Sequence, residues 1–255
     1  MVNFALIRPM FGGTLTQSQV DGINAIIAAH ARWGRKDNIN DLAYALATAW
    51  WETGQAMQPV YERGSKAYFA KYEPSTKRGK TLGNTLAGDG YRYRGTGLVQ
   101  LTGRRNFGFW AKRLGVDLLA HPEMAMQPDI AARILIEGMK LGTFTGKDLD
   151  DYIDDLDETD EEDRREYLAA RRTVNGTDRA NEIADAAIKF EKALRTPSSV
   201  PQPAPRRAPL PPDVPVMPTL PSPAPGPNKV RTTSVLAAIL LPILYGILKF
   251  FGWAP

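Results

Sequence analysis

The proline-rich stretch near the C-terminus limits where this chain can build a hydrophobic core. Thirteen of its 20 prolines fall between Pro197 and Pro227, and a segment of that composition is extended polyproline rather than part of a packed domain. The folded part is therefore predicted to occupy residues 1–195, followed by a proline-rich linker over residues 196–231. The chain has no cysteine, which excludes disulfides and thiolate chemistry.

The segment after the linker is predicted to be a single transmembrane helix. Val235–Leu248 is uninterrupted apolar sequence, and counting its flanks over residues 232–253, with Lys249 reaching back to the interface, gives the roughly 20 residues that a bilayer requires. Basic residues lie mainly before this span. The positive-inside rule then places the large N-terminal domain on the cytoplasmic side of a membrane.

The segment Asp41–Gly54 is predicted to be a buried helix with a carboxyl group at its end. Leu42 and Leu46 recur at helical spacing, and a glycine ends a helix without strain. Glu52 then lies in the last turn beside two tryptophans. Apolar neighbours and the negative end of the helix dipole both disfavour a charged carboxylate, so this side chain is a candidate general acid. The alternative is a solvated glutamate at a helix end.

The rest of residues 1–195 reads as mainly α-helical. The segment Thr16–Gln19 has capping-box spacing. Apolar periodicity predicts helices over residues 17–31, 103–114, 128–139, 164–174 and 179–194. Glycines and prolines interrupt residues 53–97, which are predicted to form long functional loops with at most a small β-hairpin.

Charge is distributed unevenly along the chain. Residues 60–113 hold twelve Lys and Arg against three acidic residues, and residues 148–166 hold twelve Asp and Glu against two arginines. The basic region favours an anionic polymer as partner, and the acidic run is typical of a solvated face. The two histidines, His30 and His121, are too isolated for a metal site. We expect no metal and no other cofactor. We also expect no nucleic-acid partner.

Three further segments carry polar groups suited to sugar chemistry. Glu62 supplies a second carboxylate ten positions after Glu52 in a loop with Arg63, Lys66 and Lys71. The segment Tyr93–Arg104 combines aromatic rings that stack on sugars, glycines that allow close approach, and hydrogen-bonding amide and hydroxyl groups. Residues 171–178 form a polar turn between two predicted helices. Read alone, Glu62 also fits a surface salt bridge, Gln100 a backbone-capping amide, and Asn175 a simple turn residue.

Together these segments resemble the glycoside hydrolase family 19 group, which holds plant-type chitinases and many phage endolysins. The resemblance covers roughly Thr16 to Leu194 and is densest at Trp51–Gly54, Tyr93–Arg104 and Asn175–Asp178. It implies a lysozyme-like helical fold that cleaves β-1,4 linkages beside N-acetylated sugars with inversion of configuration.

The resemblance also assigns residues. Glu52 falls on the family's general acid, and the second carboxylate is Glu62 by the phage-type pattern or Glu73 by the longer plant-type spacing. An inverting enzyme needs such a pair about 6.5–9.5 Å apart to hold a water molecule between the base and the sugar. The predicted substrate-binding residues are Tyr93, Gln100, Thr102, Asn106, Arg172 and Asn175.

One departure from the family pattern bears on function. The family commonly has a histidine before the acid, where this chain has Trp51. The hypothesis is a membrane-tethered, muramidase-like endolysin of phage or prophage type, acting on peptidoglycan glycan strands. A chitinase is the alternative enzyme. The alternative from another class is an inactive wall-binding or virion structural protein that keeps the fold.

Overall fold

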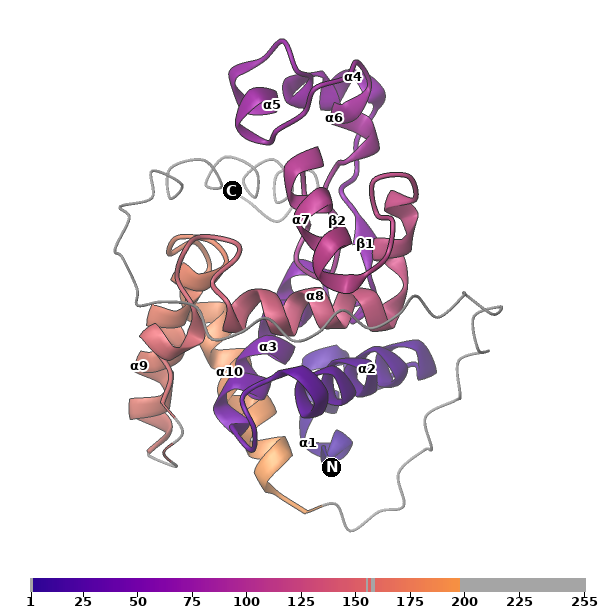
Figure 1. Cartoon of the computed structure of the whole chain (residues 1–255). Helices are drawn as coiled ribbons and strands as arrows, with labels where there is room; N and C mark the ends of the chain where they lie inside the picture. Colours follow the sequence, from indigo (N-terminus) through magenta and orange to yellow (C-terminus); the bar gives the residue numbers. More distant parts are fainter. Residues whose placement is uncertain (1, 155, 157–158, 198–255) are drawn as a thin grey trace.

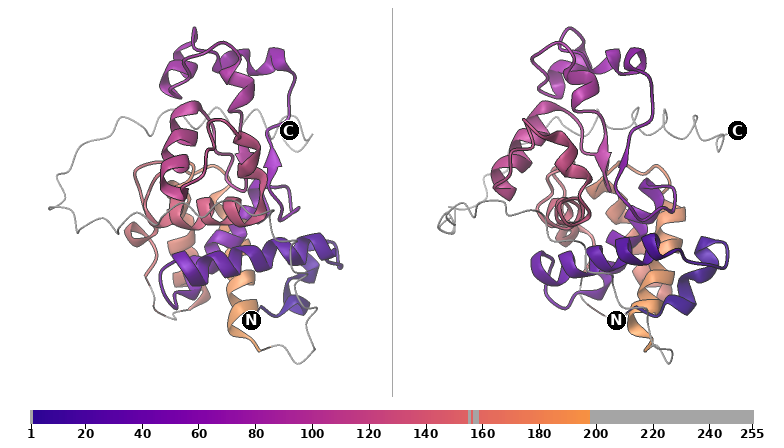
Figure 2. Two further views of the ribbon diagram at one scale, coloured as in Figure 1. Left: turned by 45° about the vertical axis from the view of Figure 1, so that its right-hand side comes forward. Right: turned by 90° about the vertical axis from the view of Figure 1, so that its right-hand side faces the viewer.

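The computed structural model of the chain describes residues 2–154, 156 and 159–197 (Figures 1 and 2). The predicted linker from residue 198 onward and the predicted anchor over residues 232–253 lie outside these residues. Within the described part of the chain, no helix is both long and apolar enough to cross a bilayer.

The described residues form α-helices, short 3₁₀-helices and one small sheet. The α-helices are α1 (Phe4–Ile7), α2 (Gln17–Trp33), α3 (Ile39–Glu52), α4 (Lys66–Phe69), α5 (Lys77–Thr81), α6 (Asp89–Arg92), α7 (Arg104–Leu114), α8 (Pro128–Lys140), α9 (Asp160–Ala170) and α10 (Ala180–Arg195). The strands are β1 (Val60–Tyr61) and β2 (Thr96–Gly97). The 3₁₀-helices are η1 (Arg8–Phe11), η2 (Ala70–Tyr72), η3 (Pro122–Met126), η4 (Leu149–Asp151) and η5 (Arg171–Thr173).

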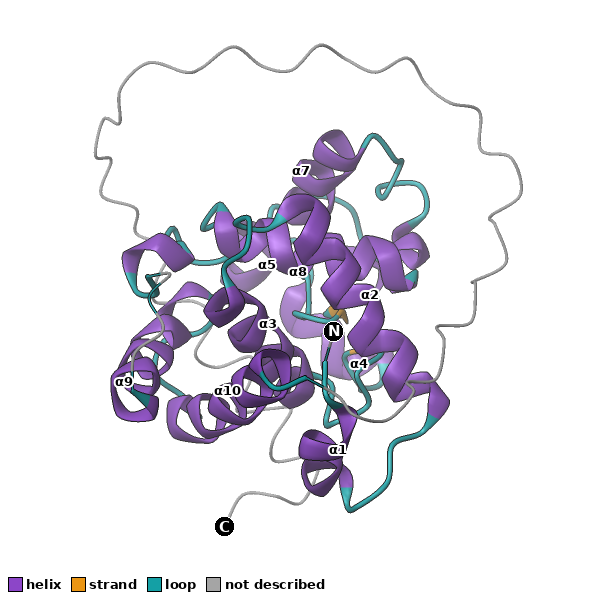
Figure 3. Cartoon of the chain, turned by 90° about the horizontal axis from the view of Figure 1, so that it is seen from below, coloured by secondary structure: helices purple, strands orange, loops and turns teal. Residues whose placement is uncertain are grey.

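Helix α3 is the centre of the helical core. It lies side by side with α10, which also packs on α9, while α2 packs on α8 (Figure 3). Every residue from Asn40 to Ala49 is buried, because neighbours cover α3 on all sides, and an all-round apolar helix is stable only in such a place. The prediction of a buried helix that ends near Glu52 is confirmed.

The helix ends follow the capping residues in the sequence. Thr16 and Gln19 form the predicted capping box at the start of α2. A second box, between Thr159 and Glu162, starts α9 at Asp160, four residues before the predicted start at residue 164. The chain leaves α9 after Ala170 and tightens into η5, so the predicted helical end at residue 174 is wrong.

Residues 62–95 form a separate upper lobe rather than long loops and a hairpin (Figure 1, top). Strand β1 pairs antiparallel with β2, with Val60 opposite Gly97 and Tyr61 opposite Thr96. The chain between the two strands carries α4, α5 and α6 around a small core of Phe69, Tyr72 and Leu82. The two-stranded ribbon thus connects this lobe to the helical body (Figure 2).

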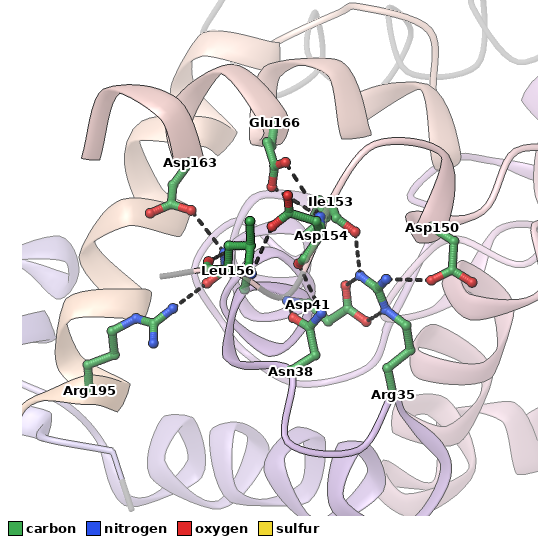
Figure 4. Close-up of polar contacts among 11 residues, drawn as sticks. Arg35, Asn38, Asp41, Asp150, Ile153, Asp154, Leu156, Asp163, Glu166 and Arg195 are labelled. Carbon is green, nitrogen blue, oxygen red and sulfur yellow. Dashed lines mark hydrogen bonds and ion pairs between the residues drawn. The ribbon is translucent and has the colours of Figure 1, made fainter. Parts of the chain in front are cut away.

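The acidic run is only partly a solvated face. Arg35 pairs with both Asp41 and Asp150, and Asn40 Nδ2 donates to Asp163 Oδ1 at 2.9 Å (Figure 4). Asp163 is buried, so at this position the acidic run packs against the body of the protein and does not face solvent. These bonds fix the acidic segment to the start of α3, at the end of that helix far from Glu52.

Candidate functional site

The end of α3 presents a carboxyl group in a largely covered position. The helix ends at Glu52, and Gly54 follows in the left-handed conformation with φ 58°, where a glycine is unstrained. Thr53 Oγ1 accepts a hydrogen bond from Met57 N at 3.0 Å and so turns the chain back on itself. The Glu52 side chain is 4% exposed. A solvated glutamate at a helix end does not fit this geometry.

A buried arginine holds the Glu52 carboxyl group. Arg171 Nη1 donates to Glu52 Oε1 at 3.0 Å, and the Arg171 side chain has no exposed surface. Its Nε donates to the carbonyl oxygen of Asp178 at 2.9 Å. Glu52 therefore has a cation beside it, and not only the apolar neighbours expected from the sequence. An arginine is always charged in proteins, so a fixed cation lies beside this carboxyl group.

The arginine at the site is Arg171, not the predicted Arg172. Arg172 is exposed, and its Nη1 lies 3.5 Å from the carbonyl oxygen of Ala169. In the same turn Asn175 is buried, at 4% exposure. Among the described protein groups, Asn175 Oδ1, Thr173 Oγ1 and Arg171 Nη2 are buried without a hydrogen-bond partner. Unsatisfied buried groups are uncommon in proteins and tend to mark functional sites.

Glu62 follows β1 and is enclosed by hydrogen-bond donors. Tyr72 OH donates to its Oε1 at 3.1 Å, the backbone N–H of Gly95 donates to its Oε2 at 3.2 Å, and Lys71 Nζ lies 3.7 Å from Oε1. Burial, and then the charge of Glu62, raise the pKa of Tyr72 above its ordinary range and the pKa of Tyr68 to about 12. Both phenols thus keep their protons. The Glu62 side chain has no exposed surface, whereas the sequence placed it in an open loop.

The ribbon brings Glu62 next to Gln100. A Cβ atom at Gly95 would lie 2.7 Å from Gln100 Oε1 and 3.2 Å from Glu62 Oε2, so a larger residue here would displace the Gln100 amide. Gln100 itself has φ 54°, a conformation that costs energy for a non-glycine residue. Its Nε2 lies 3.3 Å from the carbonyl oxygens of Val60 and Gly97, and these contacts hold the amide beside the ribbon.

Three predicted binding residues share one hollow of about 320 Å³. Gln100, Thr102 and Asn106 line it together with the exposed ring of Phe109 and with Val174. Val174 precedes Asn175, so the hollow extends from the Gln100 segment to the turn that holds Glu52. Neither Glu52 nor Glu62 lines it.

Tyr93 is buried, although its predicted role in substrate binding calls for an accessible ring. Its ring is 1% exposed and packs on Phe107, and its hydroxyl donates to the carbonyl oxygen of Leu119 at 2.9 Å. The ring therefore packs in the core and offers little surface on which a sugar could stack. Trp51 stands where the family has histidine, and its ring lies 5.7 Å from the Arg179 guanidinium.

Glu73, the other candidate for the second carboxylate, has a structural role in the upper lobe. Its two carboxylate oxygens accept hydrogen bonds from the backbone N–H groups of Gly88, at 2.8 Å, and Gly90, at 3.2 Å. These amides belong to the first turn of α6, where an acidic side chain is stabilising. The geometry therefore favours Glu62 as the partner of Glu52.

This difference predicts opposite outcomes for two matched variants. Glu62→Gln is expected to lower the rate of glycan hydrolysis by at least about 100-fold, since it removes a base. Glu73→Gln is expected to leave the rate near that of the native chain and to lower the free energy of unfolding by about 1 kcal/mol through a weakened cap. Initial rates and thermal unfolding of both variants check this. A loss of activity with Glu73→Gln alone would reverse the assignment.

Among the described residues, no cluster of three or more His, Cys, Asp or Glu side chains is arranged to hold a metal ion. The candidate site contains one carboxyl group bound to a buried guanidinium and a second one surrounded by hydrogen-bond donors. Such a pair of differently surrounded carboxyl groups is suited to general acid and general base roles.

The structure is similar to solved chitinases. Chitinase C from Streptomyces griseus HUT6037 matches with a TM-score of 0.51 and 20% identity over 79% of each chain. A bacterial family 19 chitinase matches with a TM-score of 0.50 and 21% identity, over 77% of this chain and 96% of its own. No protein-family model and no curated protein matches the sequence. At these identities the likeness shows the fold, and the helical fold that the resemblance implied is confirmed.

Proposed function

We propose that the chain is an inverting glycoside hydrolase that cleaves β-1,4 linkages between N-acetylated amino sugars. The observation that carries this proposal is the Glu52 carboxyl group at the end of α3, 4% exposed and 3.0 Å from the fully buried Arg171 guanidinium. The described part of the chain also has a hollow whose polar lining is Gln100, Thr102 and Asn106, and a second buried carboxyl group, that of Glu62. The fold shared with family 19 chitinases supports the same class of reaction.

In the proposed mechanism, Glu52 protonates the glycosidic oxygen. The Glu52 Oε2 atom has no hydrogen-bond partner among the described residues, whereas Oε1 is held by Arg171. One oxygen is thus available to the substrate while the other fixes the orientation of the carboxyl group. Once the proton has left, the Arg171 guanidinium stabilises the remaining carboxylate, because a buried ion pair is little screened.

Glu62 is proposed as the general base that activates a water molecule on the opposite face of the sugar. Its contacts with Lys71 and Tyr72 keep the carboxylate buried when no substrate is bound. Hydrogen bonds of catalytic groups often take their working geometry only in the substrate complex. We propose that substrate binding opens the contact with Lys71 and admits the water.

Peptidoglycan is the proposed substrate, and the cell wall of a bacterial host the proposed target of a phage or prophage endolysin. The upper lobe and α7 concentrate basic side chains, with twelve Lys and Arg over residues 60–113, and a wall polymer with carboxylates suits this charge better than neutral chitin does. Chitin is the second candidate, because the similar solved structures are chitinases. Initial rates on purified peptidoglycan and on chitin oligomers, offered side by side, separate the two. Faster cleavage of chitin would favour the second candidate.

A protein that binds the wall without cleaving it is the candidate from another class. It is suggested by Trp51 in place of the family's histidine. Sugar binding with no release of reducing ends, under conditions in which a known lysozyme is active, would support it. Release of reducing ends that depends on Glu52 excludes it.

We further propose that residues 232–253 tether the enzyme to a membrane, with the catalytic domain on the cytoplasmic side until the membrane is breached. Support comes from the apolar run Val235–Leu248 and from the basic residues before it. In inverted vesicles a cytoplasmic domain faces outward and is digested by added protease. A protected catalytic domain in such vesicles would contradict this placement, and recovery of the full chain in the soluble fraction would contradict the tether.

A further inference from the structure

A second hollow, of about 700 Å³, lies against the ribbon next to Glu62. Its lining includes Tyr61, Leu86, Tyr91 and Arg94. Tyr61 directly precedes Glu62, and successive side chains of a strand point to opposite faces. Glu62 is not among the residues that line the hollow, whereas Tyr61 directly before it and Arg94 on the facing segment are.

The Arg94 guanidinium lies close to two tyrosine rings at the edge of this hollow. Its guanidinium carbon lies 4.1 Å from the ring centre of Tyr61 and 4.3 Å from that of Tyr91. Its Nη1 donates to the carbonyl oxygen of Tyr91 at 2.9 Å. A guanidinium fixed in this way loses little entropy when the N–H groups along its edge bind a planar anion such as a carboxylate.

The charge of this guanidinium is not neutralised within the described part of the chain. Of the acidic residues that line the hollow, Asp89 makes two bonds of 2.7 Å to Arg104, and Glu123 pairs with His121 at 3.1 Å. No carboxylate there forms an ion pair with Arg94. The Arg94 guanidinium therefore presents to the hollow a positive charge that no described carboxylate neutralises.

The surroundings of Arg94 are suited to a sugar-bearing ligand. Leu86 is 60% exposed and Tyr91 37% exposed, so apolar surface lies next to the charge. The Lys66 ammonium group is 5.6 Å from the Tyr91 ring centre and adds a second cation at the rim. Apolar and aromatic surface with a few fixed polar or charged groups is typical of sites that bind small ligands.

We infer that this hollow is an accessory site for a carboxylate-bearing glycan, with Arg94 binding the carboxylate and Tyr91 and Leu86 covering the sugar. Peptidoglycan carries carboxylates on its peptide stems, and chitin carries none. The identity of the glycan rests on the proposed function, but binding at Arg94 does not require cleavage. The site would hold the wall polymer beside the cleft and favour peptidoglycan over chitin.

Binding of the full-length chain to insoluble peptidoglycan tests this inference. All variants carry Glu52→Gln so that the polymer stays intact. Arg94→Gln is expected to weaken binding to peptidoglycan free of teichoic acid by about tenfold, as for a lost charged hydrogen bond, and to leave binding to chitin unchanged. Arg94→Lys keeps the charge but loses the planar pair of N–H donors, and is expected to bind with an affinity between those of Arg94→Gln and the native residue. Lys80→Gln, at an exposed lysine of the same lobe, is the control for charge alone.

The outcomes are distinct. Equal losses with Arg94→Gln and Lys80→Gln would overturn the inference, as would an equal loss on chitin. A loss seen only with purified teichoic acid would replace the carboxylate with a phosphate as the bound group and so overturn the carboxylate assignment. Thermal unfolding shows whether Arg94→Gln remains folded, and Tyr91→Ala, which removes one side of the stack, provides a second route to the same loss. If the native chain binds peptidoglycan through Arg94 and cleaves nothing, the inference holds and the proposed function fails.

Discussion

Replacing Glu52 with glutamine is expected to abolish glycan hydrolysis, with a loss of at least about 10²–10⁴-fold from the missing proton donor. Glutamine has nearly the same shape, and its side-chain oxygen still accepts the hydrogen bond that Arg171 Nη1 donates to Glu52 Oε1 at 3.0 Å. The fold should therefore survive the change. Initial rates on purified peptidoglycan, together with circular dichroism of the same sample, measure both effects.

A matched control for this variant is Glu161→Gln. Glu161 lies on α9 and is exposed, so the same change in charge and shape occurs away from the site. We expect the native rate from this control. A Glu52→Gln variant with a near-native rate would remove Glu52 from the mechanism, and a variant that fails to fold would show that the carboxyl group serves mainly to neutralise Arg171.

Replacing Arg171 with methionine is expected to have the largest effect on stability. The arginine side chain is fully buried and joins Glu52 to the carbonyl oxygen of Asp178, so its loss leaves two buried acceptors without a partner. Removing one member of a buried ion pair costs about 3–5 kcal/mol. In a domain of this size, that corresponds to a fall in Tm of roughly 6–20 °C. Thermal unfolding of the purified chain measures the change.

Two comparisons make this prediction specific. Arg172→Gln changes the neighbouring, exposed arginine and is expected to shift the free energy of unfolding by less than about 0.5 kcal/mol. The double variant Arg171→Met with Glu52→Gln removes both charges and is expected to be more stable than Arg171→Met alone, because no buried charge then lacks a partner. Equal effects of the two arginine changes would contradict the contact between Arg171 and Glu52.

The sequence predicts those parts of the fold that depend on local periodicity. Helix α3 and its end at Gly54 could be predicted, since a run of small and apolar residues closed by a glycine leaves few alternatives. The upper lobe could not, because α4, α5 and α6 are four or five residues long, too short to show a period. The pairing of β1 with β2 joins segments far apart in the sequence, and no local pattern reveals it.

The candidate site shows the same division. Glu52 could be found from its position at a helix end. The choice between Arg171 and Arg172 depends on which of the two side chains the turn after α9 directs into the protein. Nothing in the sequence of two adjacent arginines in a polar turn shows which one is buried. In the structure, the first of them, in η5, is the buried one. The position of Tyr93 raises a related difficulty. Among the tyrosines and arginines that alternate over residues 91–94, only the three-dimensional structure shows which ring is buried.

Mass spectrometry of purified peptidoglycan after digestion tests the central claim most directly. The native chain is expected to release muropeptides with N-acetylmuramic acid at a new reducing end, and the Glu52→Gln variant is expected to release none. Glycan strands left intact by the native chain, or fragments cut only in their peptides, would contradict the assignment of a glycoside hydrolase that uses Glu52.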